Sequence, residues 1–321
     1  MEEGEKMKFL KRRARFLAGM CLLQFPIALL LPDVWWISAT THFLPQQILL
    51  LLASILIWKF PAWRALGVVL GIALAAVILI SPFLPEIVSD IESAEAGNVI
   101  QPDVQLISFN VLTSNSRKKD VSEWISSSLS KESPNVVFLM ETDDAWIESL
   151  KDLERALPYK YLNPRTDNFG LAIYSSVPIE NAGVEVFEDV CGVPQFIGDL
   201  RLPAKTLRLF GSHTLPPMAP GNIEYRDACI DVIENEAMKS PMPTVVAGDL
   251  NCSPWSRCFP RRLTDSFPLL FRKHTWNALG GIVSTPLDHV LHTPGVRTKA
   301  HVGPADLGSD HRPIVTQIWV D

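Results

Sequence analysis

Several short apolar runs beyond residue 103 end in polar side chains that could do chemistry. Side chains at the ends of buried strands project where a packed scaffold meets open loops, which is the usual place for a functional site. Each of them alone is typical of a strand-terminal cap or turn, whereas their combination favours one shared site. The residues, each with the run that it follows, are Asn110 (LISF), Glu141 (VVFLM), His213 (LFGS), and Asp249 with Asn251 (VVAG).

These carboxylate and amide side chains, together with Asp310, offer oxygen ligands. Oxygen ligands suit a hard ion such as Mg²⁺ or Mn²⁺ better than zinc. Phosphate ester hydrolysis requires a metal to stabilise charge, a base to activate water, and donors that hold the phosphate. With two or three histidines, this set could supply all three functions.

The elements that must position these side chains follow from hydrophobic periodicity. Short β-rich apolar runs predict buried strands, and apolar residues at three- and four-residue spacing predict helices between them. The resulting α/β domain begins near Asp103. The predicted strands are Val104–Asn110, Val136–Met140, Leu171–Tyr174, Leu207–Ser212, Val245–Gly248, Asp288–Leu291 and Ile314–Trp319, and the predicted helices are Val121–Leu129, Ala145–Ala156 and Glu224–Met238.

A set of short motifs in this region resembles the endonuclease/exonuclease/phosphatase superfamily, which has the deoxyribonuclease-I-like fold. The resemblance covers residues 103–320, and GDLN followed by SDH is its most specific portion. It implies a four-layer α/β sandwich, in which two packed, mainly antiparallel sheets are flanked by helices, and a Mg²⁺-dependent hydrolase acting on ester bonds. The motifs are SFNVL at 108–112, MET at 140–142, SHT at 212–214, GDLN at 248–251, LDHV at 287–290 and GSDH at 308–311.

The resemblance also implies roles for a metal site and a histidine pair. Glu141 would be the principal metal ligand, Asn110 would lie beside it as a ligand or hold the phosphate, and Asp310 would add to the metal site. His311 would act as general acid/base or polarise the phosphate, and Asp288 would orient it. The resemblance leaves open whether one or two metal ions take part.

The other implied roles concern water and the phosphate. Asp249 would activate or orient the attacking water, Asn251 would donate to a phosphoryl oxygen, and His213 would stabilise developing negative charge. Asn168 would contact the phosphate from a neighbouring strand. The remaining histidines of this region, which we interpret as structural or surface residues, are His274, His289, His292 and His301.

Three apolar stretches near the N-terminus, Phe16–Leu31, Leu44–Trp58 and Ala65–Leu84, predict transmembrane helices. The first two reach the length of a span only with flanking residues. Six Lys/Arg precede the first stretch, and Lys59 and Arg64 lie between the second and third, so both basic segments are predicted to be cytoplasmic. Three crossings then place the rest of the chain outside the cytoplasm.

The sequence therefore divides into four parts. They are a basic cytoplasmic N-terminus (1–15), three transmembrane helices (16–85), a linker (86–102) and the catalytic domain (103–321). Residues 1–85 carry eight Lys/Arg and four Asp/Glu, a net +4, which leaves −10 for residues 86–321 out of the total of −6. That charge disfavours a surface that grips nucleic acid.

The five cysteines are scattered and form no CxxC pair, so they predict neither a zinc site nor a dense disulfide framework. We expect plain core or loop residues. Pairing of Cys252 with Cys258 in an oxidising compartment stays open.

Three functions fit these patterns. The first is a membrane-anchored phosphoesterase, dependent on Mg²⁺ or Mn²⁺, that hydrolyses a phosphoester or pyrophosphate on the extracytoplasmic side. The loop Leu215-Pro216-Pro217 resembles the membrane-bound bacterial branch of the superfamily, including members associated with glycopeptide resistance, and this favours a lipid-linked or small phosphorylated substrate. The second is a membrane-tethered nuclease, disfavoured by charge. The third is a scaffold without turnover, disfavoured by the full catalytic set. The bilayer is the one partner that the sequence indicates.

Overall fold

The structure, a computed structural model, describes residues 5, 8–14, 16, 40–43, 45–47, 101–184, 187–219, 221–267, 273–278 and 283–321. Across these residues, no helix has both the length and the apolar character needed to cross a bilayer. The three predicted spans lie outside the described residues, apart from Phe16 and residues 45–47, and so does nearly all of the predicted linker.

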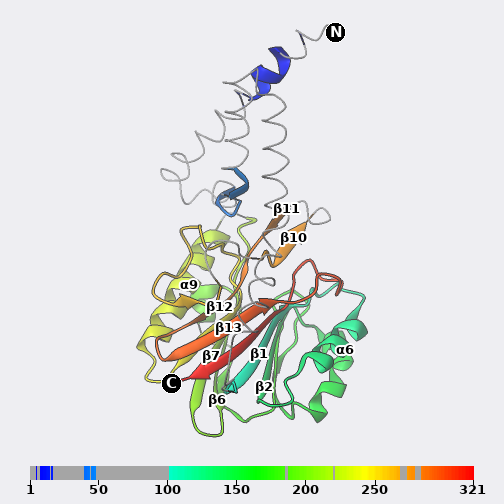
Figure 1. Cartoon of the computed structure of the whole chain (residues 1–321), viewed down its shortest axis with the longest axis vertical. Helices are drawn as coiled ribbons and strands as arrows, with labels where there is room; N and C mark the ends of the chain where they lie inside the picture. Colours follow the sequence, from blue (N-terminus) through cyan, green and yellow to red (C-terminus); the bar gives the residue numbers. More distant parts are fainter. Residues whose placement is uncertain are drawn as a thin grey trace.

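Two large sheets form the centre of the catalytic domain (Figure 1). Both are mainly antiparallel, and within the described residues the parallel neighbours are β1 with β2 and β7 with β8. This arrangement agrees with the predicted sandwich of two mainly antiparallel sheets. The first sheet has the order β13 (Val296–Val302), β14 (Ile314–Val320), β1 (Val104–Asn110), β2 (Asn135–Met140), β4 (Leu171–Ser175) and β3 (Tyr159–Asn163). The second has the order β5 (Ile179–Gly183), β6 (Phe196–Arg201), β7 (Thr206–His213), β8 (Thr244–Asp249), β12 (Asp288–His292) and β9 (Thr264–Asp265).

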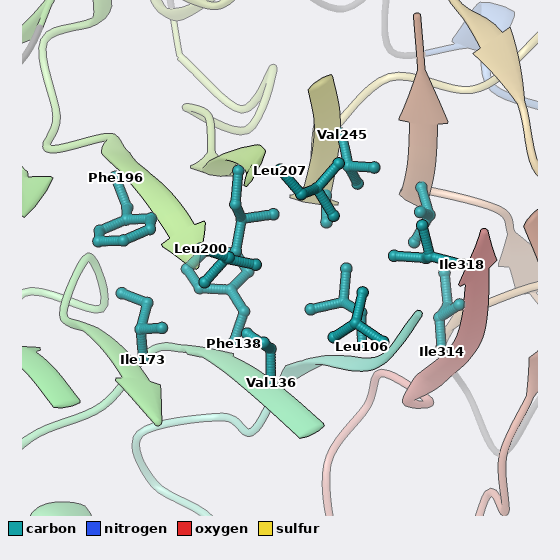
Figure 2. Close-up of a cluster of buried hydrophobic side chains, with 14 of the residues drawn as sticks. Leu106, Val136, Phe138, Ile173, Phe196, Leu200, Leu207, Val245, Ile314 and Ile318 are labelled. Carbon is teal, nitrogen blue, oxygen red and sulfur yellow. The ribbon is translucent and has the colours of Figure 1, made fainter. Parts of the chain in front are cut away.

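The main hydrophobic core lies between the two sheets (Figure 2). Leu106 and Phe138 contribute to it from the first sheet, and Leu207 and Val245 contribute from the second. Alternate residues of each strand point to opposite faces, so the next residue along β1, Ile107, packs on the outer side of its sheet. Both faces of the central strands are covered, which is why their sequences are continuous apolar runs.

Helices cover the outer faces and complete the four layers. The helix α6 (Lys118–Ser128), the helix α7 (Asp144–Ser149) and the 3₁₀ turn Lys151–Arg155 pack beside the first sheet. The helix α9 (Asn222–Lys239) covers the second sheet, and the short helix α8 (Glu188–Cys191) packs against α9. Figure 1 shows α6 and α9 on opposite sides of the strands.

The seven predicted strands and the predicted helices at 121–129 and 224–238 are confirmed, with ends that differ by up to three residues. The single helix predicted at Ala145–Ala156 is wrong, because the chain breaks at Leu150 into α7 and a 3₁₀ turn. Leu150 and Leu153 are both buried, and a spacing of three aligns side chains in a 3₁₀ helix better than in an α-helix.

Four longer strands were not predicted: β3, β5, β6 and β13. Two of them, β3 and β13, each expose much of their length, so polar residues interrupt the apolar pattern, as in VRTKAHV. A search for continuous apolar runs cannot find such strands. The structure also has a small hairpin of β10 (Trp276–Ala278) and β11 (Val283–Thr285).

The cysteines correct another expectation, because four of them form two disulfides. Cys191 at the end of α8 joins Cys229 on α9, with Cα atoms 4.5 Å apart. Cys252 joins Cys258 and closes the loop that follows β8. The first pair is separated by 38 residues of sequence, so only the packing of the two helices brings it together. Cys21 lies outside the described residues.

Gly248, on β8, lies close to Ser212 of the neighbouring strand β7 and to Phe138 of the first sheet. Its φ is +136°, and a Cβ atom at this position would lie 1.9 Å from the carbonyl oxygen of Ser212 on the neighbouring strand β7. A side chain here would force the strands apart directly before Asp249.

We expect Gly248→Ala to lower the free energy of unfolding by about 3 kcal/mol or more, since it combines a backbone clash with an unfavourable φ. Gly295→Ala is the matched control, because Gly295 has a φ of +82° and nothing within 4 Å of its added Cβ. That control should cost only about 1 kcal/mol. Urea unfolding followed by tryptophan fluorescence would measure both values, and equal losses would contradict the close packing of β7 and β8.

Candidate active site

The site lies where the carboxyl ends of the two parallel strand pairs meet. Asn110 ends β1 opposite Met140, the last residue of β2, and His213 ends β7 opposite Asp249, the last residue of β8. Glu141 follows Met140 directly. Because the carboxyl ends of parallel strands reach the same edge of a sheet, each sheet delivers two polar residues to one place.

Asn110 joins the two halves of the site. Its side-chain Nδ2 donates to Glu141 Oε1 at 2.9 Å and to Asp249 Oδ2 at 3.3 Å. Thr113 also holds the glutamate, since its hydroxyl donates to the backbone oxygen of Glu141 at 2.9 Å. A buried amide therefore connects a carboxylate of the first sheet to a carboxylate of the second.

His311 is held between two buried aspartates. Its Nδ1 lies 2.8 Å from Asp288 Oδ2, and its Nε2 lies 3.4 Å from Asp249 Oδ2. The two aspartates face each other across β8 and β12. The Nδ1 contact leaves the Nε2 edge of the ring directed at Asp249 and the pocket.

The pKa values follow from this arrangement. Burial disfavours the charged form of His311, but the negative charges of Asp288 and Asp249 outweigh burial and raise the pKa of His311 to about 10. Burial also raises the pKa of Asp249, and there the attraction of His311 does not compensate. In Asp288 burial is outweighed by the charge and hydrogen bond of His311, so its pKa is lowered.

His213 and Asn251 occupy the side of the site nearest β7. The Nε2 atom of His213 lies 3.8 Å from Asp249 Oδ2, its ring packs on Phe169 with centroids 5.0 Å apart, and burial lowers its pKa. Its Nδ1 has no hydrogen-bond partner among the described residues. The Asn251 amide donates to the Thr214 oxygen at 2.8 Å, which leaves a second N–H of the same group.

The polar residues open into a pocket of about 420 Å³. Asp310 lies at its edge, where Trp276 Nε1 donates to Asp310 Oδ2 at 3.0 Å, and Asn168 lies on its exposed rim. Apolar side chains line the pocket as well. This apolar lining, which we call the apolar wall, consists of Phe43, Phe169, Pro216, Pro217, Met218 and Leu287.

The donor set fits a divalent cation on electrostatic grounds. Glu141, Asp249 and Asp310 all line the pocket, and no Lys or Arg is present among the described residues that line it. Burial raises the pKa of Glu141, against hydrogen bonds from Asn110 and Thr113, so its carboxylate lacks compensating positive charge. A phosphate could approach these carboxylates only if a cation lay between them.

Two groups of side chains could hold that cation. Asp249, Asp288 and His311 offer ligand atoms within 4.8 Å of one another. However, the Nδ1 atom of His311 is already engaged by Asp288, so these three are better suited to moving a proton. Glu141, with Asp310 nearby, has its carboxylate at the pocket wall and offers the oxygen ligands that a hard cation requires.

Three of the site residues adopt left-handed backbone conformations that are unfavourable for residues other than glycine. They are Glu141 (φ 60°), Asn168 (φ 67°) and Asn251 (φ 46°). Each such residue costs about 1–3 kcal/mol and persists only when surrounding contacts hold it. The strain is concentrated at the pocket, as is usual for functional sites.

The structure thus brings together Asn110, Glu141, His213, Asp249, Asn251, Asp288, Asp310 and His311, with Asn168 at the rim. Sequence analysis did not find His42, Phe43, Trp276 or Met218, which line the same pocket or support its residues. Trp276 begins the three-residue strand β10, which is too short for a periodic pattern, and Met218 belongs to a loop. His42 stands in a connection without Lys or Arg between two apolar stretches, and a lone imidazole there was the available signal.

The sequence matches the family model described as "Endonuclease/Exonuclease/phosphatase family" over residues 107–311. Among curated proteins, none matches the sequence.

Solved structures of TDP2 share the fold at low sequence identity. A humanized TDP2 from D. rerio has a TM-score of 0.56 and 18% identity, covering 66% of this chain and 98% of that one. D. rerio TDP2 complexed with a single-strand DNA product has a TM-score of 0.55 and 17% identity, covering 67% and 98%. Truncated TDP2 from Caenorhabditis elegans has a TM-score of 0.53 and 17% identity, covering 68% and 97%.

We expect Asp288→Asn to lower the pKa of His311 toward its ordinary value, because one of the two charges that stabilise the imidazolium is removed. NMR titration of the imidazole in metal-free protein would measure this pKa. A raised pKa adds stability that is complete below pH 6.5 and is lost as pH rises through about 10. The loss of unfolding free energy over that interval should therefore shrink in the variant.

Asp199→Asn is the matched control, since Asp199 pairs with Arg208 on the second sheet away from the pocket. It should change stability without moving the pKa of His311. Identical titration of His311 in wild type and Asp288→Asn would contradict the assigned pair.

Proposed function

Because the chain belongs to the endonuclease/exonuclease/phosphatase family, whose members are hydrolases acting on phosphoester bonds, we propose that it is a divalent-metal-dependent phosphoesterase. The observation that carries this proposal is the convergence of Glu141, Asp249 and Asp310 with His311 on one pocket that no Lys or Arg lines among the described residues. Such a pocket suits a phosphate ester only together with a cation.

Glu141 and Asp310 would hold Mg²⁺ or Mn²⁺. When bound, the cation supplies positive charge that stabilises the phosphoryl oxygens and the leaving group. Asn110 keeps the Glu141 carboxylate in place through its amide N–H. Because burial raises the pKa of Glu141, a bound proton competes with the cation, and metal affinity should rise with pH.

The second sheet supplies the side chains that would transfer protons. Asp249 is positioned to accept a proton from the attacking water, and its raised pKa makes it a better base than an ordinary aspartate. The protonated His311, held by Asp288, donates a hydrogen bond to a phosphoryl oxygen through Nε2. His213 and the remaining N–H of Asn251 add donors on the other side of the phosphate.

The apolar wall of the pocket supports a substrate with a nonpolar group next to its phosphate. Met218 is 70% exposed at this wall, beside Pro216 and Pro217. The same segment resembles the membrane-bound bacterial branch. A phosphoester or pyrophosphate on a lipid would place its phosphate at the carboxylates and its chain against these side chains.

A membrane-tethered nuclease is the second candidate. TDP2 shares the fold, and one TDP2 structure is a complex with a single-strand DNA product. The charge of −10 over residues 86–321 and a pocket without lining Lys or Arg among the described residues disfavour a phosphate backbone as ligand.

We further propose that the chain is anchored in the cell membrane with its catalytic domain outside the cytoplasm. Two disulfides support this side, since disulfides persist in oxidising compartments. The contacts of His42 with Ser253 and Ser256 agree with the predicted topology, in which the connection before the second span and the catalytic domain lie on the same side of the membrane.

We expect purified full-length protein to hydrolyse a lipid-linked phosphoester or pyrophosphate only with Mg²⁺ or Mn²⁺, and to cleave single-stranded and duplex DNA poorly. Glu141→Gln should reduce the rate by about 100-fold or more, because it removes the principal charge that holds the cation. Glu148→Gln is the control, since Glu148 is exposed on α7. Phosphate release measures both rates. Metal-independent activity would reject the metal-dependent mechanism, and cleavage of DNA alone would reject the lipid-linked substrate and favour the nuclease.

Reporter fusions test the side of the membrane. Alkaline phosphatase, which is active only outside the cytoplasm, should be active when fused after Asp321 and inactive when fused after Phe60, in the second basic connection. A fluorescent reporter that matures only in the cytoplasm should give the opposite pattern. The reverse result at both positions would overturn the proposed orientation.

A further inference from the structure

Residues 40–47 lie outside the part of the chain that matches the family, yet the structure places them against the catalytic domain. In Figure 1, the lighter blue of the two short blue segments lies beside the β10–β11 hairpin. Gln46 Nε2 donates to the Ser284 oxygen at 2.9 Å, and the His42 carbonyl oxygen accepts from Trp255 Nε1 and Thr285 Oγ1, each at 2.8 Å. Backbone and side chains of this segment are thus held by strand β11 and by the loop that follows β8.

The His42 ring is the centre of the contact. The side chain is only 4% exposed. Its Nδ1 lies 3.1 Å from the backbone nitrogen of Ser253 and 3.1 Å from the hydroxyl of Ser256. Its Nε2 lies 3.3 Å from Arg226 Nη1. A neutral imidazole accepts through only one nitrogen, and the cationic Arg226 donor favours the tautomer in which Nε2 accepts and Nδ1–H donates to the Ser256 hydroxyl. Both ring nitrogens therefore face polar groups of the catalytic domain.

The groups that contact His42 also hold Asn251 in place. The same Nη1 atom of Arg226 donates to the backbone oxygen of Asn251 at 3.1 Å. Ser253 and Ser256 belong to the loop that the Cys252–Cys258 disulfide closes directly after Asn251. His42 thus contacts the loop directly after Asn251 and also the arginine that binds the Asn251 carbonyl oxygen.

This turn requires external support. Asn251 has a φ of 46°, and left-handed residues other than glycine persist only when their surroundings fix them. Arg226 is 1% exposed and reaches the turn from α9, so a contact that fixes the guanidinium also fixes the Asn251 carbonyl. His42 and Phe43 also line the pocket, so the segment forms part of its wall.

We propose that His42 is a positioning residue for the hydrolytic reaction: through Arg226 and the Cys252–Cys258 loop it holds Asn251 in its productive conformation, so that the active site is complete only when residues 40–47 are docked. This inference rests on the proposed phosphoesterase activity. It predicts that a residue from outside the family-matched region sets the rate of the chemical step.

Full-length His42→Ala, His42→Gln and His42→Asn variants test the proposal with bis(p-nitrophenyl) phosphate and Mg²⁺. This small soluble diester does not depend on lipid presentation. We expect His42→Ala to lower kcat by about 10-fold or more, as does loss of other residues that orient a catalytic group, and to change KM by less than about threefold. A Gln side chain can offer an oxygen to Arg226, so His42→Gln should recover most of kcat, and His42→Asn should recover less.

The control is His301→Ala, because His301 is an exposed histidine on β13, far from the pocket. It should leave kcat and KM at wild-type values. A kcat for His42→Ala within twofold of wild type would overturn the proposal, as would a loss that His42→Gln fails to recover.

Hydrogen exchange measured by mass spectrometry gives a readout that needs no turnover. The backbone nitrogen of Ser253 lies 3.1 Å from His42 Nδ1 and is covered by the ring, so peptides that cover residues 249–256 should exchange faster in His42→Ala and normally in His301→Ala. Unchanged exchange in His42→Ala would overturn the proposal even if wild type fails to hydrolyse the diester. That failure, in contrast, would count against the proposed phosphoesterase and not against the docking of His42.

Discussion

The amide of Asn110 is the contact on which the rest of the site depends. It is fully buried at the end of β1 and donates to one carboxylate from each sheet, Glu141 and Asp249. Two carboxylates close together in a poorly hydrated place repel each other, so they must share a donor or a cation. The sandwich supplies the donor by bringing the carboxyl ends of two parallel strand pairs to a common edge. The folding of the sheets and the chemistry of the pocket therefore have the same geometric requirement.

The two sheets contribute side chains with different roles to the site. Glu141, from the first sheet, keeps an uncompensated charge that suits a cation, whereas Asp249 and Asp288, from the second, surround His311 and raise its pKa. Different neighbours therefore separate a metal-binding group from proton-transfer groups without a large distance between them. The apolar wall beside them limits water and gives the pocket two chemically distinct ends.

Much of this arrangement could be predicted from the sequence, for physical reasons that also explain the failures. Strands β1, β2 and β8 are covered on both faces, so they are continuous apolar runs whose ends mark Asn110, Glu141 and Asp249. Strand β13 has an exposed face and could not be found in this way. The Cys191–Cys229 disulfide and the docking of His42 depend on tertiary packing between distant segments, which no local pattern encodes. The roles assigned to the site residues stay predictions.

The contact between His42 and Ser253 joins positions 211 residues apart, and His311 lies farther along the chain than either of them. Contacts of such high sequence separation form late, because the intervening chain must first be synthesised and folded. A nascent polypeptide that has emerged only as far as Asp249 lacks both the imidazole and its aspartate partner from β12. The pocket therefore stays incomplete until the chain has been synthesised beyond His311, and products terminated before that residue would lack the site.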